Sequence, residues 1–180
     1  SNFKMEGGNF KNAPCESCSG KNYDHSFVYK INTWNFKIEK VVEVGSGSKA
    51  IVANDALKMI AVANYSSGDI HIISSKTNKV IKQLNVGKYP SAIAYHQNKK
   101  QIYVALAGEK NIAVINIKNW QISFIENVGY SINDLCLDEK KNTMYASLKE
   151  DGKVAKINLN NNATQYAKTG REPRTIALSS

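Results

Sequence analysis

A pair of cysteines is the first feature of this 180-residue sequence that could do chemistry. Cys15 and Cys18 form a Cys-x-x-Cys motif, whose thiols can bind a metal, act as a redox pair or close a local disulfide. A tetrahedral metal site needs four ligands, and no second Cys-x-x-Cys pair follows. Ser19 stands where the usual c-type haem attachment motif has a histidine. Cys15 and Cys18 are therefore candidate metal or redox residues, although a local disulfide or two free thiols explains the motif more simply.

Among the three histidines, His96 has the position best suited to hold a cofactor. It follows a predicted strand over residues 91–95, and loops at strand ends often carry binding residues. Histidine is a common ligand of metals, which makes His96 a candidate cofactor-binding residue. Asn54 and Asp138 hold the equivalent place in the repeat described below, so a polar turn residue is the alternative interpretation. Taken as a whole, the sequence leads us to expect no cofactor.

Motifs that would place a hydrolase nucleophile, a phosphate-binding loop or a metalloprotease zinc site are absent from the sequence. Its glutamates occupy non-equivalent places in the repeat, so no pair of carboxylates is predicted to share a site. We therefore assign no catalytic residue and expect a protein that is not an enzyme. Trp34 and Trp120 lie in outer connections, where they are candidate interface anchors or caps of a sheet edge.

The charge balance is basic, with 24 lysines and arginines against 15 acidic residues and a formal net charge of +9. The lysines are scattered singly or in pairs, and no stripe of basic residues alternates with aromatics, as a single-strand binding groove requires. We interpret the charge as a solvated surface and expect no nucleic-acid partner.

No apolar run reaches the roughly 18 residues of a membrane-spanning helix. The chain starts at Ser1, and we interpret this start as processed or trimmed.

The elements that must position these residues are revealed by an internal repeat. Gly45, Gly87, Gly129 and Gly170 are spaced by 42, 42 and 41 residues. Apolar residues recur in phase after each glycine, as four short runs rich in β-branched and aromatic side chains that are bounded by turn residues. The inner runs are apolar on both faces, so each sheet needs cover in front and behind. Four strands per 42 residues with such cover predict the stacked blades of an all-β propeller.

The repeat also predicts the boundaries of the blades, of which about four are represented. Residues 1–24 match no blade and form an N-terminal extension that carries the Cys-x-x-Cys motif. The blade region, residues 25–180, divides into a partial blade at 25–45, complete blades at 46–87, 88–129 and 130–170, and a partial blade at 171–180. We expect a third and fourth strand in the first partial blade and a leading strand over 173–178. Asn32, Ser74, Asn116 and Asn158 share one position after the third strand, where a short polar side chain can cap a turn.

The second repeat resembles a known propeller motif. Gly87-Lys88-Tyr89-Pro90, followed by Ser91-Ala92-Ile93-Ala94 and by Ile102-Tyr103-Val104-Ala105, is similar to the YVTN-type β-propeller repeat of the WD40-like superfamily. The third repeat departs from this pattern, since Ile132 replaces the proline. WD40 repeats proper have a similar period, but their Gly-His and Trp-Asp dipeptides are absent here.

The resemblance implies a non-enzymatic binding scaffold in the periplasm or on the cell surface, which holds another protein or a small ligand on one propeller face. It also leaves two enzymatic alternatives open: part of a periplasmic redox enzyme or its accessory subunit, as in haem-dependent nitrite reductases, or a lactonase-like hydrolase. Members of the family usually have about seven blades, so remaining blades or a second chain would complete the ring. The alternative is a closed four-bladed ring, in which the C-terminal strand joins the N-terminal pair.

Overall fold

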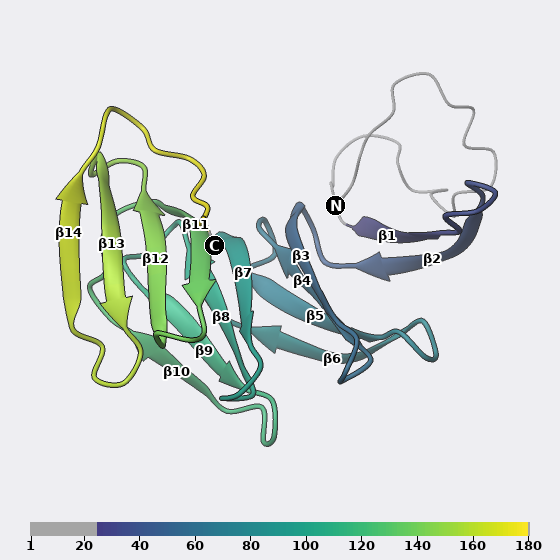
Figure 1. Ribbon diagram of the computed structural model, residues 1–180. Helices are drawn as coiled ribbons and strands as arrows, with labels where there is room; N and C mark the ends of the chain where they lie inside the picture. Colours follow the sequence, from purple (N-terminus) through teal and green to yellow (C-terminus); the bar gives the residue numbers. More distant parts are fainter. Residues whose placement is uncertain (1–24, 180) are drawn as a thin grey trace.

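Residues 25–179 are described by a computed structural model, and all regular structure in this range is β-strand (Figure 1). The fourteen strands are β1 (Ser26–Ile31), β2 (Ile38–Val44), β3 (Ser48–Asn54), β4 (Met59–Asn64), β5 (Asp69–Ser74), β6 (Lys79–Asn85), β7 (Pro90–His96), β8 (Gln101–Leu106), β9 (Ile112–Asn116), β10 (Ile122–Ile125), β11 (Ile132–Asp138), β12 (Thr143–Leu148), β13 (Lys153–Asn158) and β14 (Thr164–Lys168). Cys15 and Cys18 lie outside the described residues.

Twelve of these strands form three antiparallel sheets of four strands each, and each sheet follows the order of the chain. We name them blade 1 (β3–β6), blade 2 (β7–β10) and blade 3 (β11–β14). The first strands β3, β7 and β11 lie beside one another on the inside of the arrangement, while the fourth strands lie on its outside (Figure 1). The predicted all-β fold of four-stranded antiparallel blades is confirmed.

The blades are held together by apolar cores between their faces. In β8, Ile102 and Val104 pack toward blade 1, whereas the alternate residues Tyr103 and Ala105 pack toward blade 3. Each of these four side chains is at most 2% exposed. Burying a large aliphatic side chain contributes about 1.5–3 kcal/mol, so a blade with neighbours on both faces gains from both sides of one strand. The inner strands are therefore apolar on both faces because each face packs against a neighbouring blade.

The hairpin β1–β2 occupies the place of the third and fourth strands of a preceding blade. Its two strands pair with each other and with no other strand of residues 25–179. Val28 and Val44 pack against Val62 and Ile73 of blade 1, so the hairpin covers the face that blade 1 turns away from blade 2.

The predicted leading strand over residues 173–178 is not formed. A first strand needs the second strand of its own sheet as a ladder partner, and no such strand is present in the described range. The segment instead lies against blade 3, where the Ile176 N–H donates to Asp134 (3.0 Å). Since the hairpin β1–β2 packs on blade 1 and this segment on blade 3, the two do not combine into one sheet.

Gly87 and Gly129, two of the repeat glycines, stand where an added side chain would crowd its neighbours. Gly87 has a φ of +131°, and a Cβ there would lie 2.9 Å from the Leu106 side chain. Gly129 has the same relation to Leu148, at 2.5 Å. At Gly170, by contrast, a Cβ would meet nothing within 4 Å. Packing against the second strand of the blade that follows therefore accounts for Gly87 and Gly129.

Strand order gives the blades two distinct ends. The glycine end carries the repeat glycines and the turns between second and third strands, and the opposite end carries the other two turns of each blade. The predicted caps after the third strand are confirmed at the opposite end: the side-chain oxygens of Asn32, Ser74, Asn116 and Asn158 accept N–H groups two or three residues ahead. Within residues 25–179, no helix is long and apolar enough to cross a membrane.

Candidate binding face at the glycine end

A lysine and two tyrosines meet where blades 1 and 2 adjoin at the glycine end. Lys49 is in β3, and its Nζ lies 4.9 Å from the centroid of the Tyr65 ring. Tyr65 follows β4 and stacks on Tyr89, which precedes β7, with ring centroids 4.9 Å apart and planes inclined by 20°. Stacked tyrosine rings lose little conformational entropy when a partner binds. The pair therefore offers a rigid contact surface of apolar rings with polar hydroxyl groups.

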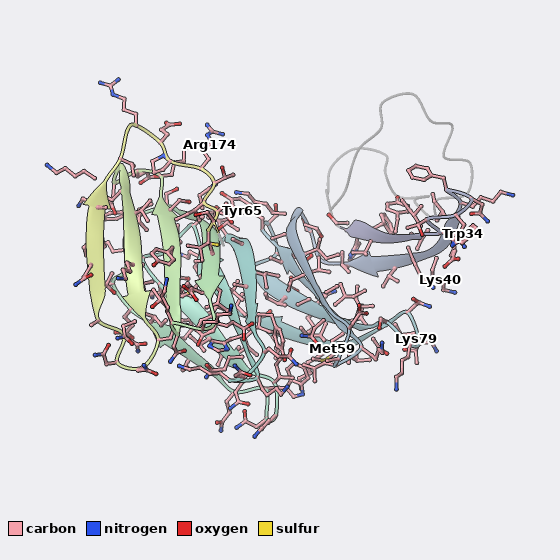
Figure 2. The ribbon with its side chains drawn as sticks, in the orientation of Figure 1. Trp34, Lys40, Met59, Tyr65, Lys79 and Arg174 are labelled. Atoms are coloured by element: carbon pink, nitrogen blue, oxygen red, sulfur yellow. The ribbon has the colours of Figure 1, made fainter. Side chains whose placement is uncertain are left out.

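Two further cations stand close to Lys49. Lys49 Nζ donates to Asn133 Oδ1 on β11 (3.5 Å), and Asn133 Nδ2 donates to the carbonyl oxygen of Arg174 (2.7 Å). Burial lowers the pKa of Lys49 below its usual value, and the positive charges of Lys149 and Arg174 lower it further. Three cations, from blade 1, blade 3 and the C-terminal segment, therefore converge in this region, and Figure 2 shows Tyr65 and Arg174 at the same end of the molecule.

A second lysine–tyrosine pair extends this surface over blades 2 and 3. Lys110 Nζ lies 4.1 Å from the centroid of the Tyr130 ring, and Tyr130 is 50% exposed. We name the whole surface the Lys–Tyr face. It consists of Lys49, Tyr65, Tyr89, Lys110, Tyr130, Lys149 and Arg174.

The loops of this face are fixed by one hydrogen bond that recurs in every blade. The N–H of Lys88 donates to Glu109 Oε1 (2.8 Å), and the N–H of Tyr130 donates to Asp151 Oδ2 (2.9 Å). Blade 1 makes the same contact through Ser67 Oγ at 3.1 Å. The acceptors all stand 22 residues after their repeat glycine, so aligning the repeats gives the signal that identifies Glu109 and Asp151 as loop-fixing residues.

A buried polar cluster supports the face from within blade 1. The carboxylate of Asp69, which is 2% exposed, accepts hydrogen bonds from Ser67 (2.6 Å), Asn64 (3.0 Å) and Gln83 (2.6 Å). Burial alone would raise the pKa of Asp69, but these three bonds and the neighbouring His71 hold it below its usual value. His71 Nε2 lies 3.2 Å from Asp69 Oδ2 in a geometry that makes no hydrogen bond. His71 is 9% exposed, so its ring is buried within blade 1.

His96, the candidate cofactor ligand, lies at the opposite end, between blades 2 and 3. It is the last residue of β7 and is 2% exposed. Nε2 lies 3.0 Å from Asn142 Oδ1, within hydrogen-bond distance. Nδ1 accepts the N–H of Lys99 (3.5 Å) and lies 3.3 Å from Glu139. The ring thus joins two blades and caps a turn, as Asn54 and Asp138 do for their own turns.

The two tryptophans named as candidate interface anchors have different surroundings. Trp34, between β1 and β2, is 98% exposed (Figure 2). Trp120 is half-buried and packs against the core between blades 1 and 2.

Among residues 25–179, no group of three or more histidines, cysteines and acidic residues is placed to hold a metal ion.

Solved structures that resemble the chain are propellers by name or by fold. Kuenenia stuttgartiensis hydrazine synthase superposes with a TM-score of 0.72 and 20% identity, over 79% of this chain and 43% of that one. U3-55K and the WD40 repeats of RRP9 each give a TM-score of 0.70 and 13% identity, over 79% of this chain and 45% and 44% of theirs. No protein-family model and no curated protein matches the sequence.

The protein therefore has the β-propeller fold. Stacked four-stranded blades in the described chain and the superposition on WD40 repeats establish this fold together. The chain spans under half the length of the solved chains that it matches.

Proposed function

We propose that the protein is a non-enzymatic β-propeller scaffold of the YVTN type, which acts outside the cytoplasm and binds a partner protein through its glycine end. The observation that carries this proposal is the Lys–Tyr face itself. Exposed tyrosines and lysines stand on loops that are pinned by a side-chain acceptor in each blade, and rigid aromatic anchors are typical of binding surfaces.

The surroundings of His96 support a scaffold in preference to a haem-binding redox subunit. The ring is buried between two blades, and both of its nitrogens contact other residues. A haem ligand needs one nitrogen free to face the iron. The YVTN assignment and the location outside the cytoplasm rest on the sequence resemblance described above.

Chemical cross-linking in the organism that makes the protein tests the proposed face, because lysines stand at both ends of the blades. With an amine-reactive cross-linker, we expect links to partner proteins from Lys88, Lys110 and Lys149 at the glycine end. Lys58, Lys76 and Lys118 at the opposite end are the matched controls, since they are equally placed in turns. Links that arise mainly from these controls would contradict the proposal.

Labelling of intact cells tests the location. A membrane-impermeant amine reagent should modify the protein before lysis as fully as after it. Modification only after lysis would show that the protein lies inside the cytoplasm, and the proposed compartment would then be wrong.

A further inference from the structure

The strongest unexplained feature is the set of cations that converges on the Lys–Tyr face beside the innermost strands. Lys49 is held next to an amide oxygen and a tyrosine ring, and it forms no ion pair with any carboxylate in residues 25–179. Lys149 and Arg174 share a single carboxylate, that of Glu172, at 3.9 and 3.3 Å. Lys49, Lys149 and Arg174 thus have a single carboxylate ion-pair partner among them, that of Glu172.

Three other carboxylates of this end, those of Glu109, Asp134 and Asp151, are engaged by backbone N–H groups. Glu109 and Asp151 accept the N–H groups of the glycine loops. Asp134 accepts the N–H groups of Leu135 (2.9 Å) and Ile176 (3.0 Å). These hydrogen bonds fix the carboxylates in place, so none of them is free to turn toward Lys49.

Such an arrangement favours the binding of an anion, because the unliganded protein leaves the positive charges only partly compensated. Lys49 is partly withdrawn from water and repelled by two like charges, and both effects disfavour its charged form. A carboxylate placed among the three cations would relieve the repulsion and supply the missing counter-ion. The Tyr65–Tyr89 pair lies directly beside this point, and Tyr89 remains 48% exposed.

We propose that the Lys–Tyr face binds an acidic segment of a partner protein, with carboxylates against Lys49, Lys149 and Arg174 and an adjacent side chain on the Tyr65–Tyr89 pair. This inference rests on the proposed function, because it names the chemistry of the partner that the scaffold holds. A compact group of cations suits one or two carboxylates. A nucleic-acid strand would instead require cations that follow a line of phosphates, with aromatic rings spaced between them.

The test is fluorescence anisotropy with a labelled ten-residue peptide of alternating glutamate and leucine, and with its glutamine counterpart. We expect the glutamine peptide to bind at least about tenfold more weakly, since it removes the charge and keeps the shape. Raising the salt from about 0.05 to 0.3 M should weaken the acidic peptide further, because the cations are accessible to screening ions.

Single substitutions locate the site. Lys49→Gln and Lys149→Gln should each weaken the acidic peptide about threefold to fivefold, the range for one accessible charge pair. Lys79→Gln removes the same charge at the opposite end and should change the affinity less than about twofold (Figure 2). Unchanged thermal unfolding of each variant ensures that binding is compared between equally folded proteins.

Three results would overturn the inference: equal binding of both peptides, equal effects of Lys79→Gln and Lys49→Gln, or preferential binding of a labelled ten-nucleotide single-stranded RNA. No binding of the acidic peptide up to about 1 mM would overturn it as well. If cross-links nevertheless cluster at Lys88, Lys110 and Lys149, the scaffold proposal stands and only the acidic chemistry fails. If they cluster at the opposite end, the scaffold proposal fails too.

Discussion

Asp69 shows how a single residue links stability to pH in this fold. Its carboxylate accepts three side-chain hydrogen bonds in a site that excludes water, and its pKa is lowered as a result. The equivalent positions of blades 2 and 3 are Asn111 and Lys153, and the space beneath their glycines is filled by Leu106 and Leu148. Blade 1 therefore replaces an apolar filling with a charged, hydrogen-bonded one.

We predict that Asp69→Asn lowers the free energy of unfolding by about 1.5–3 kcal/mol at pH 7, the range for hydrogen bonds to a charged group. Because the pKa of Asp69 is lowered in the folded protein, its contribution is complete above the unfolded pKa of about 4 and is lost as the pH falls through the folded value. Urea unfolding should therefore show a difference between the two proteins that shrinks below about pH 4. A difference of constant size from pH 7 to pH 3 would contradict this account.

His96 allows the turn cap and the contact between blades to be separated. His96→Ala removes both and should cost about 2 kcal/mol, since it leaves polar groups of Lys99 and Asn142 unpaired. His96→Asn restores the capping side chain that blade 1 has at Asn54, so it should recover about half of this loss. Equal losses in the two variants, measured by chemical unfolding, would show that the cap contributes nothing.

The same position tests the redox alternative. Adding haem to the purified protein should give no absorbance change that depends on His96, because both ring nitrogens already have contacts. A haem spectrum that appears with the natural protein and disappears in His96→Asn would instead assign the ligand role to this residue.

At the scale of single elements, the repeat glycines are the most direct link between sequence and packing. Gly87→Ala should destabilise the protein by about 2–4 kcal/mol, because a Cβ would meet Leu106 in a backbone conformation that disfavours side chains. Gly170→Ala is the matched control and should change stability by less than about 0.5 kcal/mol. Comparable losses in the two variants, in thermal or urea unfolding, would contradict the packing explanation.

Periodicity was sufficient to predict strands, blades and turn caps, because each of these depends on residues that recur in the same phase. Residues 173–178 have the local pattern of a first strand, but no strand forms there because the described chain holds no second strand of that sheet to pair with. The Lys–Tyr face was missed for a different reason. Lys49, Asn133 and Arg174 are far apart in sequence and meet only because three innermost strands and the C-terminal segment converge.

Considered as a whole molecule, the described chain ends its stack with blade 3 on one side and the hairpin β1–β2 on the other, and no further blade of the described chain covers the outer face of either. Blade 3 turns the half-buried Tyr145 and Val154 away from blade 2. Each of these faces is available to pack against another surface.

We expect the 180-residue chain, when produced alone, to self-associate through these faces. Light scattering at tens of micromolar should give a mass above the 19.9 kDa of one chain. Tyr145→Lys should shift the mass toward one chain, whereas Tyr130→Lys, on the Lys–Tyr face, should not. A chain that stays monomeric at every concentration would contradict the expectation.

The central claim is that blades 1, 2 and 3 stack face to face in the order of the chain, and methyl–methyl nuclear Overhauser effects test it most directly. We predict cross-peaks between Ile72 and Ile115 and between Ile112 and Ile157, because each pair belongs to one core between adjacent blades. Ile72 and Ile157 should show none, since blade 2 separates them. Cross-peaks between Ile72 and Ile157, with none from either to blade 2, would show two sheets packed as a sandwich and would contradict the propeller.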